Sequence, residues 1–463
     1  MSPSASINKL PIETLAEIFK VYAVAHPEVL DRRVVDLCLV GKHWKAVADG
    51  TPQLWTKINL KFPFGYRQLN AASKRIHASK LEEIDVSIDF RKPYWNGDGP
   101  HYEGIDTEAT NEALWAKNIS TVLRGTESRW RSIGVVSDTW LPLHRLIEAW
   151  NSTDLLSLRS IRMERASVIF GTRAVAFDPA TLIRPITLFG RKAFLPKLRD
   201  LALSAVHVDW EDISVGFQNL RELRLNNLPL DIGPSSKVFA AMLSSSPRLE
   251  CLDVSGFCPK RHTGSVPLAG MGSEIPIVHL PALKEFTFGW KDVGRGSSFL
   301  KMFQIGSSLE RLTLKDTDSG LGCWRSEPAR SRDWNQNSEN IFKLLHSLAV
   351  AAPRDENDMP PTPFISMSGV KTLKIFWTEA SSGAVTPFLG LLREVVDVEL
   401  EDVDEGVLRA VVAAWGSRAR ADHRPMMVDL GWMWQAGIPS FAAGTTLDLE
   451  QAGIKVFVRE TEG

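Results

Sequence analysis

Cysteine is scarce in this chain. Its 463 residues include only Cys38, Cys251, Cys258 and Cys323, which are scattered without a disulfide-like pattern. Such usage is typical of a reducing compartment. An excess of charge of one sign is also lacking, because 54 basic and 55 acidic residues leave a net charge of −1. Binding to nucleic acid or to an anionic membrane needs a basic excess or a basic stripe, so the composition indicates neither partner.

Long apolar runs are absent as well. No stretch approaches the ~18 apolar residues that a membrane-spanning helix needs. The first residues, MSPSASINKLPIE, lack the basic start and the apolar run of a secretory signal. We therefore expect an intracellular protein of the cytoplasm, the nucleus or both, with no membrane segment.

Motifs for catalysis and cofactor binding are missing too. Gly294 and Gly296 of VGRGSS do not follow a strand in a phosphate-binding frame, and the ten histidines form no close pair. Cys251, Cys258 and His262 lack an obvious fourth ligand, and zinc sites usually show cysteines separated by about two to four residues. We expect no cofactor, no metal and no catalytic residue, so the chain is predicted not to be an enzyme.

A short repeat is the strongest pattern that is present. Apolar residues at positions 1, 4 and 6 of a template recur ten times, as Leu249, Leu252 and Val254 do in SPRLECLDVSGF. Positions 4 and 6 alternate with polar residues, so each match predicts a strand with one buried face. The matches begin at residues 81, 130, 158, 198, 220, 249, 283, 309, 370 and 395.

Amphipathic helical segments such as SSKVFAAMLSSS and ENIFKLLHSLAVAA separate the matches. Alternation of strands and helices predicts parallel pairing, and strands with one buried face place all the helices on one side of the sheet. The predicted fold class is α/β, with a curved parallel sheet in an irregular βα solenoid over residues 58–463. Long loops are predicted near 259–279, 316–340 and 352–366. The L-x-x-L-x-L pattern resembles the leucine-rich repeat family.

The first 57 residues follow a different pattern. In LPIETLAEIFKVY the apolar residues share one helical face, and Pro11 stands where a helix tolerates it. In the next segment Gly41 predicts two short helices that meet there, and Thr51-Pro52 ends the second. Three helices over about 50 residues bury little apolar surface, so such a domain needs a partner or a neighbouring domain. We predict an all-α domain over residues 1–57 that something outside it covers in part.

This segment resembles an F-box, the motif that docks receptor proteins onto the Skp-type adaptor of cullin–RING (SCF-type) ubiquitin ligases. The matching residues are Leu10-Pro11, Leu15, Ile18-Phe19, Val40, Lys42-His-Trp44 and the run W-x-x-V-A-x-x-T-P-x-L-W over residues 44–55. Gly41 replaces the more usual Cys or Ser, and the segment between the first two helices is long. The resemblance implies adaptor contacts at Leu10, Pro11, Ile12, Leu15, Ile18, Val40, Trp44 and Trp55.

With the repeats, the resemblance implies a substrate-recognition subunit, which reaches cullin and RING subunits through the adaptor and binds a protein client with the solenoid. Alternatives stay open. An amphipathic cap on the first strand of the array would also explain the apolar helices. A repeat scaffold that joins proteins without a ubiquitin role would explain the solenoid, and a divergent hydrolase within the loops is a third alternative.

Positions 3, 5 and 7 of each repeat are expected on the uncovered face of the sheet. There the middle of the array offers basic residues such as Arg224 and Lys374, and its end offers three aligned carboxylates, Asp397, Glu399 and Glu401. Opposite charges steer and align protein partners. We predict that this face binds the client and that the carboxylates receive a basic segment of it.

Overall fold

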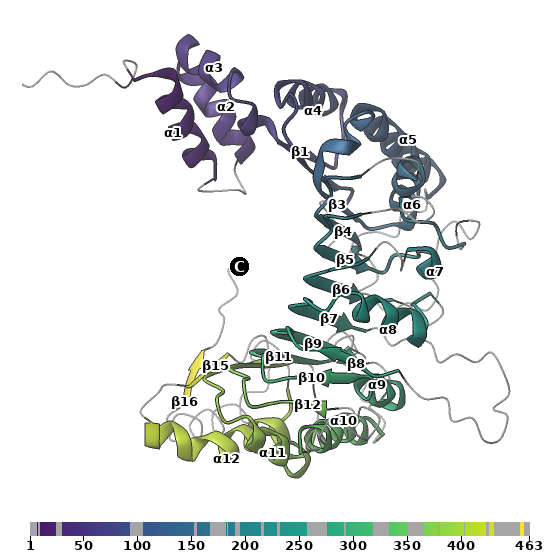
Figure 1. Cartoon of the computed structure of the whole chain (residues 1–463), viewed down its shortest axis with the longest axis vertical. Helices are drawn as coiled ribbons and strands as arrows, with labels where there is room; N and C mark the ends of the chain where they lie inside the picture. The colour runs from purple at the N-terminus through teal and green to yellow at the C-terminus, as the bar shows by residue number, and fades with distance from the viewer. Residues whose placement is uncertain are drawn as a thin grey trace, which may run out of the picture. The chain divides into compact units, whose positions relative to one another are not determined.

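Figure 1 shows the computed structural model of the chain. Its residues divide into two compact units. Unit 1 comprises Met1–Ser167 and Phe177–Leu198, and unit 2 comprises Val168–Ala176 and Arg199–Gly463. The structure describes residues 7, 10–24, 30–92, 105–151, 155–166, 182, 184–189, 195–213, 217–228, 232–256, 276–290, 293–317, 333–350, 364–376, 378, 380–401, 403–422, 426–429 and 454–457.

Unit 1 begins with a helical bundle. It consists of α1 (Ile12–Val24), α2 (Leu30–Val40), α3 (Lys42–Asp49) and the 3₁₀ helix η3 (Pro52–Trp55). Gly41 separates α2 from α3 in extended backbone, so the predicted break at this glycine is confirmed. The predicted domain boundary at residue 57 falls inside unit 1, where η3 gives way to the first strand.

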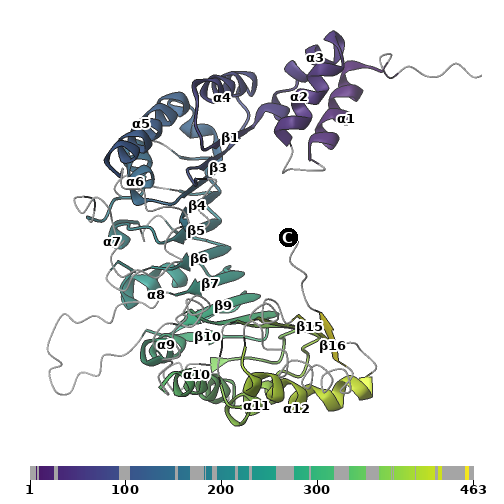
Figure 2. The same ribbon diagram turned by 180° about the vertical axis from the view of Figure 1, so that it is seen from behind.

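Four parallel strands follow the bundle in chain order. They are β1 (Lys57–Lys61), β2 (Ile84–Asp89), β3 (Trp130–Ser137) and β4 (Ser160–Arg165). The connecting helices are α4 (Tyr66–Ala78), α5 (Ile105–Leu123) and α6 (Trp140–Trp150), with the 3₁₀ helix η4 (Glu127–Arg129) before β3. Both views show these α-helices on one face of the strands (Figures 1 and 2). This arrangement is the one expected of strands that alternate buried and exposed residues.

The free edge of β1 is covered by side chains of α4. The hydrogen bonds from Asp85 N to Thr56 O and from Phe62 N to Asp89 O place residues 56, 58, 60 and 62 toward β2, so the backbone groups of Lys57 and Lys61 point away from it. Arg75 Nη1 donates to Lys57 O at 3.2 Å, and Gln68 Nε2 donates to Lys61 O at 3.1 Å. An edge strand occupied in this way is less open to pairing with another chain.

Unit 2 continues the alternation of parallel strands and connecting helices. Its main strands pair in parallel in the order β5 (Asp200–Ser204), β6 (Glu222–Asn226), β7 (Cys251–Ser255), β9 (Glu285–Trp290), β11 (Arg311–Asp316), β13 (Thr372–Phe376), β14 (Asp397–Glu401), β15 (Met426–Asp429) and β16 (Ile454–Phe457). Its helices are α7 (Trp210–Ile213), α8 (Ser236–Ser244), α9 (Val293–Leu300), α10 (Asp333–Val350), α11 (Ser382–Leu391) and α12 (Glu405–Asp422). The chain is therefore an α/β protein with extensive parallel sheet.

All ten template matches are strands, and positions 4 and 6 are buried in each of them. The first template position is buried too, with one exception. Leu81 is 91% exposed; the preceding Lys80 adopts a left-handed conformation (φ 51°), and Ser79 before it is buried. The period-2 prediction thus holds for every strand, and the turn before β2 departs from it.

A second, smaller sheet in unit 2 was not predicted from the sequence. Its three parallel strands, in spatial order, are β12 (Phe364–Ile365), β10 (Phe303–Ile305) and β8 (Val278–Leu280). Two of them correct the predicted loops, because β8 begins within 259–279 and β12 lies within 352–366. The loop over 316–340 is corrected as well, since α10 begins at Asp333. Most of the remaining loop residues lie outside the described part. Within the described part, no helix combines the length and the apolar character needed to cross a membrane.

Candidate functional site

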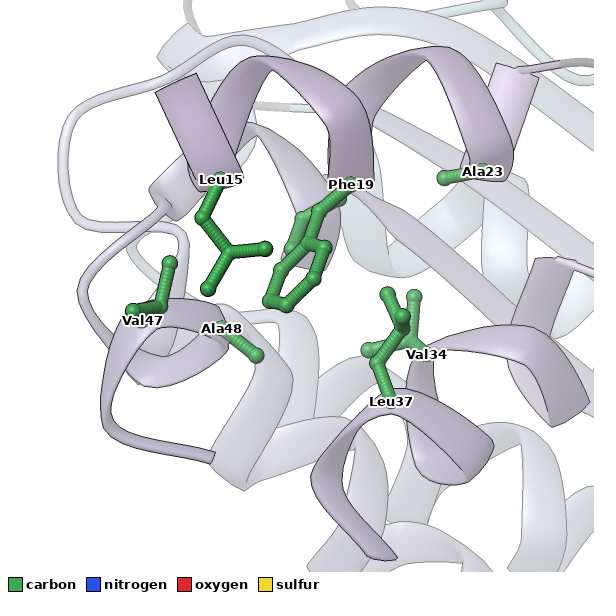
Figure 3. Packing of buried hydrophobic residues seen from close by; sticks show 8 residues of the cluster. Leu15, Phe19, Ala23, Val34, Leu37, Val47 and Ala48 are labelled. Atoms are coloured by element: carbon green, nitrogen blue, oxygen red, sulfur yellow. The ribbon is translucent and has the colours of Figure 1, made fainter. Parts of the chain in front are cut away.

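The bundle closes its own apolar core. Leu15, Phe19 and Ala23 are spaced four residues apart on α1, so they share one helical face, and all three are buried. This face packs against side chains from the other elements of the bundle (Figure 3). These side chains are Val34, Leu37, Val47, Ala48 and Leu54.

The structure corrects the prediction for Leu15. Its side chain is 0% exposed, so it belongs to the core and cannot contact an adaptor. Trp44 is half-buried against the same core, and its ring centroid lies 5.0 Å from that of Phe19. Leu10 is half-buried, whereas Pro11 is exposed at the start of α1.

Large apolar side chains are nevertheless exposed on the outside of α1 and α2. Of the fourteen exposed large apolar residues in the described part of the chain, seven lie on these two helices. They are Ile12, Ile18, Val21, Tyr22, Val35, Leu39 and Val40. Single exposed apolar residues are ordinary, but their concentration on two neighbouring helices makes these helices the candidate contact surface of the bundle.

The outer face of α2 is the most exposed part of this surface. Val35 and Leu39 lie one turn apart, Leu39 is 76% exposed, and the adjacent Val40 is 60% exposed. The resemblance named Val40 but missed the other two. Six of the seven residues in VVDLCLV (34–40) are apolar, more than one helical face can bury, and this signal would have identified them.

On α1, Ile12 and Ile18 are exposed, as an adaptor contact requires. Tyr22 is partly covered by Arg33 of α2, whose guanidinium lies 4.5 Å from the ring centroid and whose Nη1 donates to Tyr22 O at 2.8 Å. We define the docking surface as Ile12, Ile18, Val21, Val35, Leu39 and Val40.

Trp55 has a different environment from these residues. It is half-buried, and its Nε1 donates to Ala48 O at 2.8 Å. The Arg75 guanidinium of α4 lies 5.8 Å from the Trp55 ring centroid. The ring is thus engaged by the bundle and by α4 of the same chain, although the resemblance placed it against the adaptor.

The uncovered face of the unit 2 sheet is polar and largely self-paired. Arg224 forms an ion pair with Glu222 at 2.6 Å, and Lys374 of β13 bonds Glu399, its register partner on β14. Asp397 is exposed at the start of β14. Glu399 therefore already has a cation partner within the sheet, and its predicted contact with a client stays a prediction. Glu401 ends the strand, and its side chain lies outside the described part.

Cys251 lies on the same face without the properties of a reactive thiol. Its pKa is raised to about 12, chiefly by burial; Arg224 lowers the pKa, and the nearby Glu222, Glu285 and Asp253 oppose that effect. A thiol with this pKa stays protonated at neutral pH, and the thiolate is the nucleophilic form. Among the described residues no group of three or more His, Cys, Asp or Glu side chains is placed to hold a metal ion. Cys258 and His262 lie outside this part.

Comparison with known proteins identifies no family for this chain. No protein-family model matches this chain, and no curated protein matches it significantly.

Proposed function

We propose that the chain is the substrate-recognition subunit of an SCF-type cullin–RING ubiquitin ligase. In this proposal the bundle is an F-box that docks on a Skp-type adaptor and thereby reaches the cullin and RING subunits. The strands and helices from β1 onward form an irregular leucine-rich-repeat solenoid that binds a protein client. The chain makes no bond itself and acts by holding the client near the catalytic subunits.

The observation that carries the proposal is the exposed aliphatic face of α2. A bundle whose core is already closed by Leu15, Phe19 and their partners gains no stability from Leu39 and Val40, which face solvent. Burying such side chains against a partner contributes about 25 cal/mol per Å² of apolar surface. The face is therefore better explained by association than by folding.

The alternative of an amphipathic cap on the first strand has less support. Two edge-facing carbonyl groups of β1, those of Lys57 and Lys61, are bonded by side chains of α4. The bundle precedes β1 in the chain, yet α4 already supplies these bonds to its edge. The apolar outer face of α2 needs a different explanation.

The test is a binding measurement on the full chain with a purified Skp-type adaptor. A double substitution, Leu39→Asp with Val40→Asp, changes only exposed side chains and should leave the bundle folded. We expect at least a tenfold loss of affinity, which corresponds to about 1.4 kcal/mol, because each carboxylate would be desolvated in the complex.

Leu81→Asp is the matched control. Leu81 is more exposed than either target residue but lies outside the bundle, so its substitution should leave adaptor affinity within about twofold. Failure of the wild-type chain to bind the adaptor would contradict the proposal and favour a scaffold without a ubiquitin role. Equal binding by the wild type and the double variant would place the contact elsewhere.

A further inference from the structure

The junction between the bundle and the sheet contains no free linker. Leu54 of η3 is buried in the bundle core, and η3 ends at Trp55. The next residue, Thr56, already accepts a hydrogen bond at its carbonyl from Asp85 N at 2.9 Å. Because β1 begins at Lys57, the chain passes from the core of the bundle into the sheet within three residues.

Arg75 of α4 contacts residues on both sides of this junction. Its guanidinium lies 5.8 Å from the Trp55 ring centroid, and its Nη1 donates to Lys57 O at 3.2 Å. Trp55 in turn donates from Nε1 to Ala48 O of α3. A planar guanidinium suits this double role, since it stacks on an aromatic face while it donates in its own plane.

A second tie joins η3 to the turn before β2. Gln53 Nε2 donates to Glu82 Oε1 at 2.6 Å. The Glu82 backbone is itself anchored, because its carbonyl accepts from Arg129 Nε at 2.9 Å, and Arg129 Nη2 donates to Ser79 Oγ at 2.6 Å. The bundle is thus bonded to the sheet at two separate places, through α4 and through this turn.

We infer that Gln53, Trp55, Arg75 and Glu82, here named the η3 coupling, fix the bundle in one orientation relative to strands β1–β4. The docking surface on α1 and α2 then keeps one direction relative to the sheet. Trp55 acts in this coupling as a positioning residue, which is a role different from the adaptor contact implied by the resemblance. The inference concerns geometry within unit 1, so it goes beyond the proposed function and does not depend on it.

Pulsed electron paramagnetic resonance on the full chain tests the coupling. Spin labels are placed at Asp36→Cys on α2, which lies outside the docking surface, and at Ser87→Cys on β2; both positions are exposed, and the four native cysteines are replaced first. The otherwise unchanged protein should give one narrow distance distribution. Trp55→Ala and Arg75→Gln should each at least double the width of this distribution. Arg75→Lys keeps a cation and a hydrogen-bond donor, so it should give an intermediate width.

Lys74→Gln is the matched control, because it removes an exposed cation from the neighbouring position of α4 and should leave the distribution unchanged. Amide exchange in the bundle core reports whether a variant still folds. If Trp55→Ala unfolds the bundle, Arg75→Gln alone tests the inference, because Arg75 lies outside the bundle. A broad distribution in the unsubstituted chain, or a narrow one in a folded Arg75→Gln variant, would overturn the inference. Adaptor binding should persist in both coupling variants, so a failure here is distinct from a failure of the proposed function.

Discussion

At the scale of single residues, neighbours in the sequence have opposite roles in the bundle. Ile18 is exposed and Phe19 is fully buried, because successive residues of a helix point about 100° apart. Both are large apolar residues, and the sequence pattern alone does not assign one to the core and one to the surface. Their substitution by alanine should therefore separate stability from docking.

We expect Phe19→Ala to lower the free energy of unfolding by about 3–5 kcal/mol, because it leaves a cavity and a domain of this size has only a small apolar core. The three helices should lose amide-exchange protection while β2 and β3 keep theirs. Ile18→Ala should change stability by less than about 0.5 kcal/mol. Hydrogen exchange followed by mass spectrometry measures both variants. Equal loss of protection in the two would show that the assignment of core and surface on α1 is wrong.

At the scale of secondary-structure elements, close packing between successive repeats leaves some glycines without room for a side chain. A Cβ atom at Gly369, in the turn before β13, would overlap Ser307 O and lie 3.0 Å from Leu309 O. These are backbone atoms of the preceding repeat, so neither can move without distorting it. Gly390, on the exposed side of α11, has no atom within 4 Å of the corresponding position.

The two glycines should respond to alanine with opposite signs. Gly369→Ala should destabilise unit 2 by about 1–3 kcal/mol, as overpacking does. Gly390→Ala should be neutral or stabilising by up to about 1 kcal/mol, because alanine has the higher helix propensity. Denaturant unfolding monitored by circular dichroism measures both midpoints. A neutral Gly369→Ala would show that the turn before β13 can move away from its neighbour.

Elements whose sequence signal lies within a few residues could be predicted, and elements that depend on distant contacts could not. The ten strands were predictable because alternation over a few residues is a local signal, and Gly41 marked the break between α2 and α3 in the same way. The strands β8, β10 and β12 have two or three residues each, too few to show a period. The first turns of α10 come from the polar stretch DWNQNSEN, which shows no apolar face. The role of Trp55 depends on Arg75, a contact that only the folded chain creates.

At the scale of the whole molecule, the candidate surfaces differ in their chemistry. The docking surface on α1 and α2 is aliphatic, whereas the uncovered face of the unit 2 sheet presents ion pairs such as Arg311–Glu285 and Lys374–Glu399. Apolar contacts persist in salt, and contacts between exposed charges are screened as the Debye length falls from about 10 Å at 0.1 M to about 3 Å at 1 M. The two modes of binding should therefore separate by ionic strength.

Affinity capture with the full chain at 0.1 M and 1 M NaCl should show this separation. We expect adaptor capture to stay within about twofold, because Leu39 and Val40 supply no charge to screen. Clients held by the sheet face should fall at least tenfold, and Leu39→Asp with Val40→Asp should remove the adaptor while these clients remain at low salt. Quantitative mass spectrometry of the captured proteins measures both effects. Loss of the adaptor in 1 M NaCl would mean that charged groups, and not the aliphatic face of α2, dominate its docking.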